Sequence, residues 1–174
     1  MIRYAITDPK YYSLEYLKNL DNKADFVLFR DKSSKNYKTL AKLFIIDTKK
    51  FSYKKIIHKD YKLAKKLRAY GVHLTSKEFS KIKKAKDLGL FVIVSTHTIK
   101  DIKRAKALKA DVVTFSPIFK TPNKGRPKGI NTLQKAAKIS NIKVIALGGI
   151  VTKKEIKRVK NSNVWGFASI RYFV

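Results

Sequence analysis

The stretch VIALGGIVTKKE (residues 144–155) joins a short apolar run to a pair of glycines and then to Thr152 and Glu155. The run Val144–Leu147 is typical of a strand that is buried on both faces of a parallel sheet. Thr152 and Glu155 have the spacing of a capping box, in which each side chain satisfies a free N–H group of the first helical turn. The stretch therefore predicts a strand, a tight turn and a helix, which together form one βα unit.

The same unit recurs along the chain. Seven further apolar runs of strand type stand at Arg3–Thr7, Ala24–Phe29, Lys55–Ile57, Val72–Leu74, Phe91–Ser95, Asp111–Phe115 and Trp165–Ser169. Amphipathic helical stretches separate them, and no long linker interrupts the series. Eight such units predict a single domain over residues 1–174 with an α/β fold, a compact (β/α)₈ TIM barrel. Because barrels of this class typically contain about 250 residues, we expect short helices and loops.

Capping residues indicate several helix boundaries. We expect N-terminal caps at Ser13, Ser76 and Thr98. Gly71 and Gly89 are expected just after helices, where a left-handed conformation is favourable. The segment 44–53 follows neither period clearly, and we interpret it as a loop or a frayed strand.

The composition limits the class of protein. The chain has 44% hydrophobic residues, no cysteine and no apolar run near the roughly 20 residues that span a bilayer. These features indicate a globular protein without disulfides or a membrane partner. The N-terminal stretch MIRYAITDPKYY has no apolar signal core, so we expect a cytoplasmic protein.

The chain is strongly basic, with a formal net charge of +29. Such a charge attracts phosphates, and nucleic acid is the obvious partner to consider. The 41 basic residues are 34 Lys and 7 Arg, however, and nucleic-acid readers depend on Arg for bidentate contacts. The lysines also spread along every predicted helix. This pattern favours a solvated lysine surface over nucleic-acid binding, and a small anionic substrate profits from the field in either case.

Residues of unusual types stand at the C-terminal ends of the predicted strands, where barrels place their functional groups. They are Arg30 and Lys32, His58 and Lys59, Ser95 and His97, Thr121 and Lys124, Gly148 and Gly149, and Ile170 and Arg171. Arg30 and Lys32 are suited to hold a pyrophosphate or to pair with Asp31 or Asp60, and the residues alone leave both readings open.

Gly148 and Gly149 are the strongest of these signals. Paired glycines between a strand and a capped helix let backbone N–H groups close on an anion, and the helix N-terminus adds positive potential. A tight turn without a ligand is the alternative. Arg171 either contacts the same phosphate or forms a salt bridge. The loop 115–129, which carries three prolines and several cations, reads as a lid over a phosphorylated substrate or as a solvated loop.

The three histidines differ in their surroundings. His73 lies between Val72 and Leu74 within a strand, so we interpret it as a packed structural residue. His58 is left undecided by its neighbours. His97 follows Ser95 by two positions at a strand end, so it either reaches a ligand and moves protons or has a structural role.

Five motifs carry a resemblance to a known family. VLFRDK (27–32) resembles VQLREK, GVHLTSKEF (71–79) resembles GVHLGQEDL, and VSTHT (94–98) resembles VSxHT. FSPIFKTPNKGRPKGI (115–130) is similar to GPVFPTxTK…GL, and VIALGGI (144–150) to VxAIGGI. On these motifs the chain resembles the superfamily of thiamine phosphate synthases and TenI-type thiazole tautomerases. The matches run in order, and the strand pattern continues on either side of them.

The resemblance implies a barrel that binds hydroxyethylthiazole phosphate through its last two strand-end loops. It implies that the phosphate is held by Gly148, Gly149, Thr121 and the Ile170–Arg171 backbone, that Arg30, Lys32 and Lys124 face a pyrimidine pyrophosphate, and that His58 and Ser95 also line the substrate site. In the synthase reaction, Mg²⁺ and cationic side chains stabilise the departing pyrophosphate, and the thiazole nitrogen captures the pyrimidine cation.

The chain also departs from the synthase pattern. Lys59 stands where the family has its first metal-binding Asp, and His58 replaces the Asn before it. Glu78 occupies the second metal-binding position and is the one metal ligand we predict. Leu28 replaces a Gln that contacts the pyrimidine. Because a hard cation prefers carboxylate oxygens, Lys59 argues against an ordinary Mg²⁺ site. We therefore expect no cofactor, and Mg²⁺ only if the protein is a synthase.

Related tautomerases lack the metal pair and use a histidine at the position that matches His97. The sequence therefore favours a tautomerase-like, metal-independent enzyme with His97, Lys124 and Arg30 as its catalytic residues. A diverged synthase that joins hydroxymethylpyrimidine pyrophosphate to thiazole phosphate is the alternative, and a non-catalytic phosphate-binding or regulatory protein is a third. The expected partners are a phosphorylated thiazole and, for the synthase, the pyrimidine pyrophosphate. Whether the protein forms a homodimer is left open.

Overall fold

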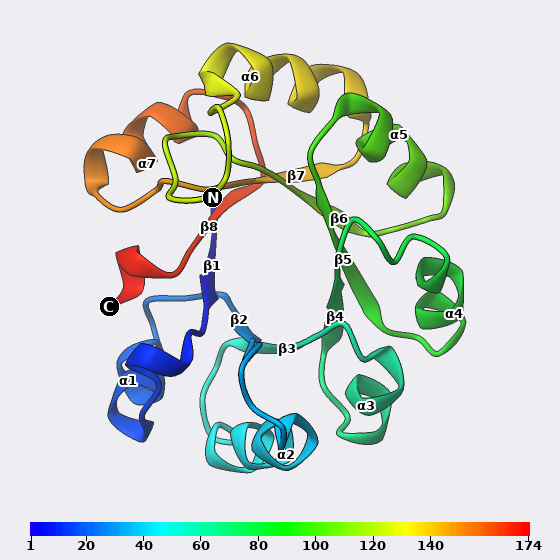
Figure 1. The fold of residues 1–174 in the computed structure, drawn as a ribbon, viewed down its shortest axis with the longest axis vertical. Coiled ribbons are helices and arrows are strands. Elements are labelled where there is room, and N and C mark those ends of the chain that lie inside the picture. Colours follow the sequence, from blue (N-terminus) through cyan, green and yellow to red (C-terminus); the bar gives the residue numbers. More distant parts are fainter.

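The computed structural model describes all residues, 1–174. Eight parallel strands pair in chain order and close into a barrel, with seven helices around them (Figure 1). The predicted (β/α)₈ barrel is confirmed. The strands are β1 (Ile2–Ile6), β2 (Phe26–Phe29), β3 (Lys54–His58), β4 (Gly71–Leu74), β5 (Phe91–Thr96), β6 (Val112–Phe115), β7 (Lys143–Leu147) and β8 (Gly166–Ser169).

The helices are short, which is how this chain builds a barrel from few residues. They are α1 (Leu14–Asn19), α2 (Tyr37–Asp47), α3 (Tyr61–Lys66), α4 (Lys81–Asp87), α5 (Ile99–Ala107), α6 (Gly129–Ser140) and α7 (Lys153–Lys160). A 3₁₀ turn, Arg171–Phe173, follows β8 in place of an eighth α-helix. None of the helices combines the length and the apolar character that crossing a bilayer demands.

Alternate side chains of the strands fill two separate cores. The inward set forms a cluster of nine buried residues inside the barrel: Tyr4, Ile6, Phe26, Leu28, Ile56, Ile93, Val112, Ile145 and Ala168. The intervening residues, such as Val27, Ile57 and Val113, belong to a cluster of 36 that lies between strands and helices. Because the strands are parallel, the last inward position of every strand lies at the same end of the barrel.

Aromatic rings close the opposite, N-terminal end of the barrel. Phe26 stacks on Phe91 with ring centroids 5.7 Å apart, and Trp165 packs against Phe26 at the same separation. Tyr70 packs against Phe91 at 5.1 Å. This apolar end leaves the C-terminal end as the place where inward-facing polar side chains gather.

Several predicted helix boundaries are confirmed. Ser13 accepts a hydrogen bond from the Tyr16 N–H and caps α1, and Thr98 forms a capping box that starts α5. The capping box of Thr152 and Glu155 starts α7. Gly89 has φ +76° just after α4, as its expected left-handed role requires.

Three local interpretations are wrong. Residues 44–47 form the end of helix α2, not a loop or a strand. The helical period was not visible in the sequence because this helix has apolar residues on its exposed face, Leu43 and Ile46, as well as on its buried face, Phe44. Gly71 begins β4, and Arg68, with φ +53°, takes the left-handed position after α3. Ser76 caps no helix, because α4 begins five residues later at Lys81.

Two histidines lie among the inward side chains near the C-terminal end. His58 is 8% exposed and His73 is 3% exposed. Burial, with a smaller contribution from the nearby cation Arg30, lowers the pKa of His58 to about 4. Burial, with a smaller contribution from His58, lowers the pKa of His73 to about 3. Both rings are therefore neutral at physiological pH.

These pKa values predict that the protein loses stability as the pH falls from about 7 to about 5. Below the ordinary histidine pKa of 6.5, His58 and His73 each bind a proton in the unfolded chain but stay unprotonated in the folded protein. The free energy of unfolding therefore rises with pH in this window, by up to about 2.7 kcal/mol per pH unit. Urea unfolding at several pH values measures this slope.

The interval from about pH 7 to about pH 5 lies above the range in which Asp and Glu titrate, so the histidines make the main contribution to the change in the free energy of unfolding there. The variant His58→Asn should show about half the wild-type slope, because one of the two excess protons is removed. A wild-type free energy of unfolding that does not change between about pH 7 and pH 5 would contradict this reading.

Candidate functional site

The C-terminal rim of the barrel carries the predicted site residues. Arg30 follows β2, His58 ends β3, and Ser95 lies in β5 with His97 just beyond it. The remaining predicted residues stand in the loop after β6 (Thr121, Lys124), after β7 (Gly148, Gly149) and after β8 (Ile170, Arg171). The closed topology thus brings residues from most of the chain to one end of the barrel (Figure 1).

Arg30 is fixed by the end of β1. Thr7 Oγ1 accepts a hydrogen bond from the Arg30 backbone N–H at 2.9 Å, and the Asp8 carboxylate lies 4.0 Å from the guanidinium. The expected alternatives, Asp31 and Asp60, are engaged elsewhere. Asp31 accepts hydrogen bonds from the serines that follow it, and Asp60 caps α3. Sequence reasoning missed Thr7 and Asp8, which carry no motif of their own.

Four cations share this side of the rim, and we call Arg30, Lys32, Lys59 and Lys124 the cation cluster. Repulsion from Arg30, followed by burial and by repulsion from Lys124 and Lys59, lowers the pKa of Lys32. Among the cluster, Arg30 alone has a carboxylate within 4.0 Å. A site with this excess of positive charge is suited to an anion that carries several negative charges, such as a pyrophosphate.

Lys59 is held in an unusual backbone conformation just after the end of β3. Its φ is +65°, in the left-handed region that residues other than glycine seldom adopt. The Lys59 N–H donates to the His73 carbonyl oxygen at 2.9 Å, which ties the turn to β4. The side chain itself is exposed.

The residues at the family's metal-binding positions do not fit Mg²⁺. Lys59 contributes a positive charge there, and the Glu78 carboxylate already accepts hydrogen bonds from Thr75 at 2.8 Å and from Lys81 at 2.6 Å. No group of three or more His, Asp or Glu side chains is arranged to hold a metal ion. Because Mg²⁺ needs oxygen ligands in near-octahedral geometry, these residues do not offer it a site. The metal role predicted for Glu78 is not supported by this arrangement.

Gly148 and Gly149 build the opposite side of the rim together with the loop after β6. Both have positive φ, +98° and +71°. A Cβ on Gly149 would come within 2.6 Å of the Lys120 carbonyl oxygen, so the close approach of the two loops requires glycine. The Phe119 N–H donates to the Gly148 carbonyl oxygen at 3.0 Å. Thr121 Oγ1 lies 3.2 Å from the position of a Cβ on Gly148, so this side chain is next to the turn, and its role in phosphate binding stays a prediction.

Free backbone donors gather between this turn and the end of β8. The N–H groups of Gly149, Ile150 and Ile170 form no hydrogen bond within the protein. Helix α7 begins just after the turn, and its N-terminus adds positive potential. Unpaired N–H groups beside a helix N-terminus are the arrangement that binds phosphate in many barrels.

His97 lies between these two regions. Its Nδ1 is 3.1 Å from the Ser116 carbonyl oxygen, and its backbone N–H donates to the Asp101 carboxylate at 3.0 Å. A proton on Nδ1 would be donated to this carbonyl oxygen, whereas an unprotonated Nδ1 would accept from the Ser116 hydroxyl, which lies farther away at 3.4 Å. The shorter contact favours the proton on Nδ1. The Nε2 lone pair is then left free, and the exposed ring can accept a proton from a ligand.

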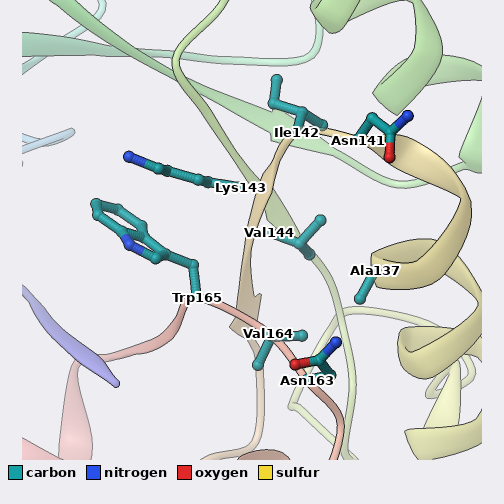
Figure 2. Close-up of a pocket in the computed structure, with 8 residues that line it drawn as sticks. All are labelled: Ala137, Asn141, Ile142, Lys143, Val144, Asn163, Val164 and Trp165. Atoms are coloured by element: carbon teal, nitrogen blue, oxygen red, sulfur yellow. The ribbon is translucent and has the colours of Figure 1, made fainter.

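A separate pocket lies at the N-terminal end of the barrel, and none of the predicted site residues lines it. It has a volume of about 470 Å³ and is lined by residues from the end of α6 and the starts of β7 and β8, among them Asn141, Val144 and Trp165 (Figure 2). Its one charged group, the Lys143 ammonium, lies 4.9 Å from the centre of the Trp165 ring. The Lys143 amine is the one ionisable group that faces this pocket, whereas the predicted site residues stand at the opposite, C-terminal rim.

Known proteins resemble this chain over nearly its whole length. The family model described as thiamine monophosphate synthase matches residues 3–173. A relative from Aquifex aeolicus named putative thiamine-phosphate synthase 2 is 35% identical, over 98% of this chain and 96% of its own. A thiamine-phosphate synthase from Clostridium tetani is 30% identical, over 79% of this chain and 68% of its own.

A solved structure shows the same fold. Thiamine phosphate pyrophosphorylase from Pyrococcus furiosus superposes with a TM-score of 0.84 at 24% identity, covering 97% of this chain and 85% of its own. The fold, the motifs around the rim and the full-length match to the family model agree. The chain belongs to the thiamine monophosphate synthase family.

Proposed function

We propose that this protein joins hydroxymethylpyrimidine pyrophosphate to hydroxyethylthiazole phosphate and releases pyrophosphate. The observation that carries the proposal is that one rim holds two separate groups of residues suited to bind anions. The cation cluster lies after β2, β3 and β6, and the free N–H groups lie after β7 and β8. Two anionic substrates need two such regions with their heterocycles between them. The names of the relatives favour this synthase reading over the tautomerase reading that the sequence alone favoured.

The proposed reaction needs charge stabilisation more than proton transfer. The bond between the pyrimidine methylene carbon and the pyrophosphate oxygen breaks, and its electron pair leaves with the pyrophosphate. The lone pair of the thiazole nitrogen then forms the new carbon–nitrogen bond. Negative charge grows on the leaving group, so preorganised cations lower the barrier. Arg30, Lys32, Lys59 and Lys124 would supply that charge, with Lys59 taking the place of a metal ligand.

A thiazole tautomerase is the second candidate, and the His97 geometry favours it. The contact with the Ser116 carbonyl oxygen favours the proton on Nδ1, which leaves Nε2 as an acceptor. Such a ring can take a proton from one atom of a bound thiazole phosphate and return it to another. The same phosphate region would serve both reactions.

The phosphate region is tested by Gly149→Ala. The added Cβ meets the Lys120 carbonyl oxygen and the Phe119 side chain, so the turn must move and its free N–H groups with it. Losing a hydrogen bond to a charged group should weaken binding of thiazole phosphate about tenfold or more. Calorimetric titration measures the affinity.

Gly89→Ala is the matched control, because Gly89 has a similar φ of +76° with open space around its Cβ position. It should cost stability without changing the affinity. If Gly149→Ala and wild type bind thiazole phosphate with equal affinity, the N–H groups near Gly149 do not bind its phosphate.

The reaction is tested by incubating wild-type protein with both substrates, either in EDTA or with Mg²⁺. We expect thiamine phosphate to form in EDTA. Lys59→Asp should lower that rate by about 10²–10³-fold, because it removes a charge that stabilises the transition state. Lys62→Asp, the same charge change on the exposed face of α3, should leave the rate near wild type.

His97→Gln separates the two candidates. The synthase reading predicts a small effect on thiamine phosphate formation, whereas a tautomerase would lose about 10²–10⁴-fold of its isomerisation rate. Formation of thiamine phosphate only with Mg²⁺ would overturn the metal-independent proposal. Binding of both substrates without any turnover would favour a regulatory protein.

A further inference from the structure

A chain of three side chains runs from the barrel interior to the rim. The Tyr4 hydroxyl lies 2.9 Å from His73 Nδ1, and His73 Nε2 lies 2.9 Å from Ser95 Oγ. Tyr4 is fully buried and His73 nearly so, whereas Ser95 is half-buried at the rim end of β5. The residues come from β1, β4 and β5, and 69 positions separate Tyr4 from His73.

Every member of this chain is neutral. Burial raises the pKa of Tyr4 well above its ordinary value, and burial lowers the pKa of His73 to about 3. A neutral imidazole carries a proton on one nitrogen only. The two hydrogen bonds can therefore run in either of two directions, from Tyr4 through His73 to Ser95 or the reverse. In the first direction the Ser95 hydroxyl hydrogen is free to be donated at the rim, and in the second it is donated to His73.

Tyr4 decides between these directions. Its hydroxyl has one hydrogen to donate, and His73 Nδ1 is its one hydrogen-bond partner. If Nδ1 carried the proton, the hydroxyl hydrogen of Tyr4 would be buried without an acceptor, which is strongly unfavourable. Tyr4 therefore donates to Nδ1, and the imidazole proton lies on Nε2.

The tautomer of His73 in turn sets the orientation of the Ser95 hydroxyl. His73 Nε2–H donates to Ser95 Oγ, so the hydroxyl hydrogen of Ser95 cannot point back at the ring. Thr114, its register partner on β6, offers no alternative, because the Thr114 hydroxyl forms no hydrogen bond at all. The Ser95 hydrogen is left without an acceptor in the protein, at the edge of the substrate region.

We propose that Tyr4 and His73 are positioning residues that fix Ser95 as a hydrogen-bond donor to an acceptor atom on the heterocyclic ring of the bound substrate. The identity of that ligand rests on the proposed function, whereas the direction of the chain does not. A ring nitrogen with a free lone pair is the chemistry that such a donor recognises, and an amino group presented at the same place would be disfavoured.

The direction is measured on wild-type protein labelled with ¹⁵N-histidine, from two-bond proton–nitrogen correlations of the His73 ring. We expect the tautomer with the proton on Nε2. Ser95→Ala should keep this tautomer, because Tyr4 sets it. Tyr4→Phe removes the donor that selects this tautomer, so the two tautomers should become closer in population and the form protonated on Nδ1 should become detectable. A wild-type ring protonated on Nδ1 overturns the inference.

The link to the substrate is measured by a double-mutant cycle on affinity for pyrimidine pyrophosphate and for thiazole phosphate. Tyr4→Phe and Ser95→Ala should each weaken binding of one of them by about threefold to tenfold. The double variant should bind no more weakly than Ser95→Ala, because Tyr4 acts through Ser95. Additive losses would indicate a merely structural role for Tyr4 and would overturn its positioning role.

Thermal unfolding of each variant reports on its folding. If wild-type protein binds neither substrate, the proposed function fails, and the tautomer measurement still decides the direction of the chain.

Discussion

The barrel depends on its closure between the first strand and the last. Ile2 pairs with Gly166 and Tyr4 with Ala168, and this contact joins the two ends of the sheet. A Cβ on Gly166 would come within 2.5 Å of the Ile2 carbonyl oxygen, so the close approach of these strands requires a glycine. Closure then forces alternate side chains into the interior and gathers all eight strand ends at one rim. The chemistry of the rim follows from the residues that occupy those last positions.

The cations at the rim lie close enough together to affect one another, unlike lysines scattered over a basic surface. Lysines cover the whole surface, but the cation cluster repels itself enough to lower the pKa of Lys32. Folding holds these like charges together at a cost in free energy, and a bound pyrophosphate would offset that cost. In the proposed reaction Lys59 would put a positive charge at the position that the resemblance assigns to a metal-binding carboxylate. With the rest of the cation cluster it would neutralise the departing pyrophosphate without Mg²⁺.

Sequence reasoning predicted the features that depend on local patterns. The apolar run before Gly148 and the capping box of Thr152 were found as expected, because strand period and cap spacing are visible within about ten residues. The end of α2 was misread because Leu43 and Ile46 face solvent and blur its period. The contacts of Tyr4 with His73 and of Arg30 with Asp8 join segments far apart in the chain, so only the closed barrel reveals them.

The cation cluster is expected to bind pyrophosphate without a metal ion. Calorimetric titration of inorganic pyrophosphate into the wild-type protein in EDTA measures this binding, with Lys59→Met as the variant that removes one positive charge. We expect saturable binding of one pyrophosphate per chain in EDTA, no tightening on addition of Mg²⁺, and roughly tenfold weaker binding by Lys59→Met, as expected for one charged contact. If pyrophosphate binds only after Mg²⁺ is added, and Lys59→Met binds it as tightly as wild type, the cluster does not replace the metal ion.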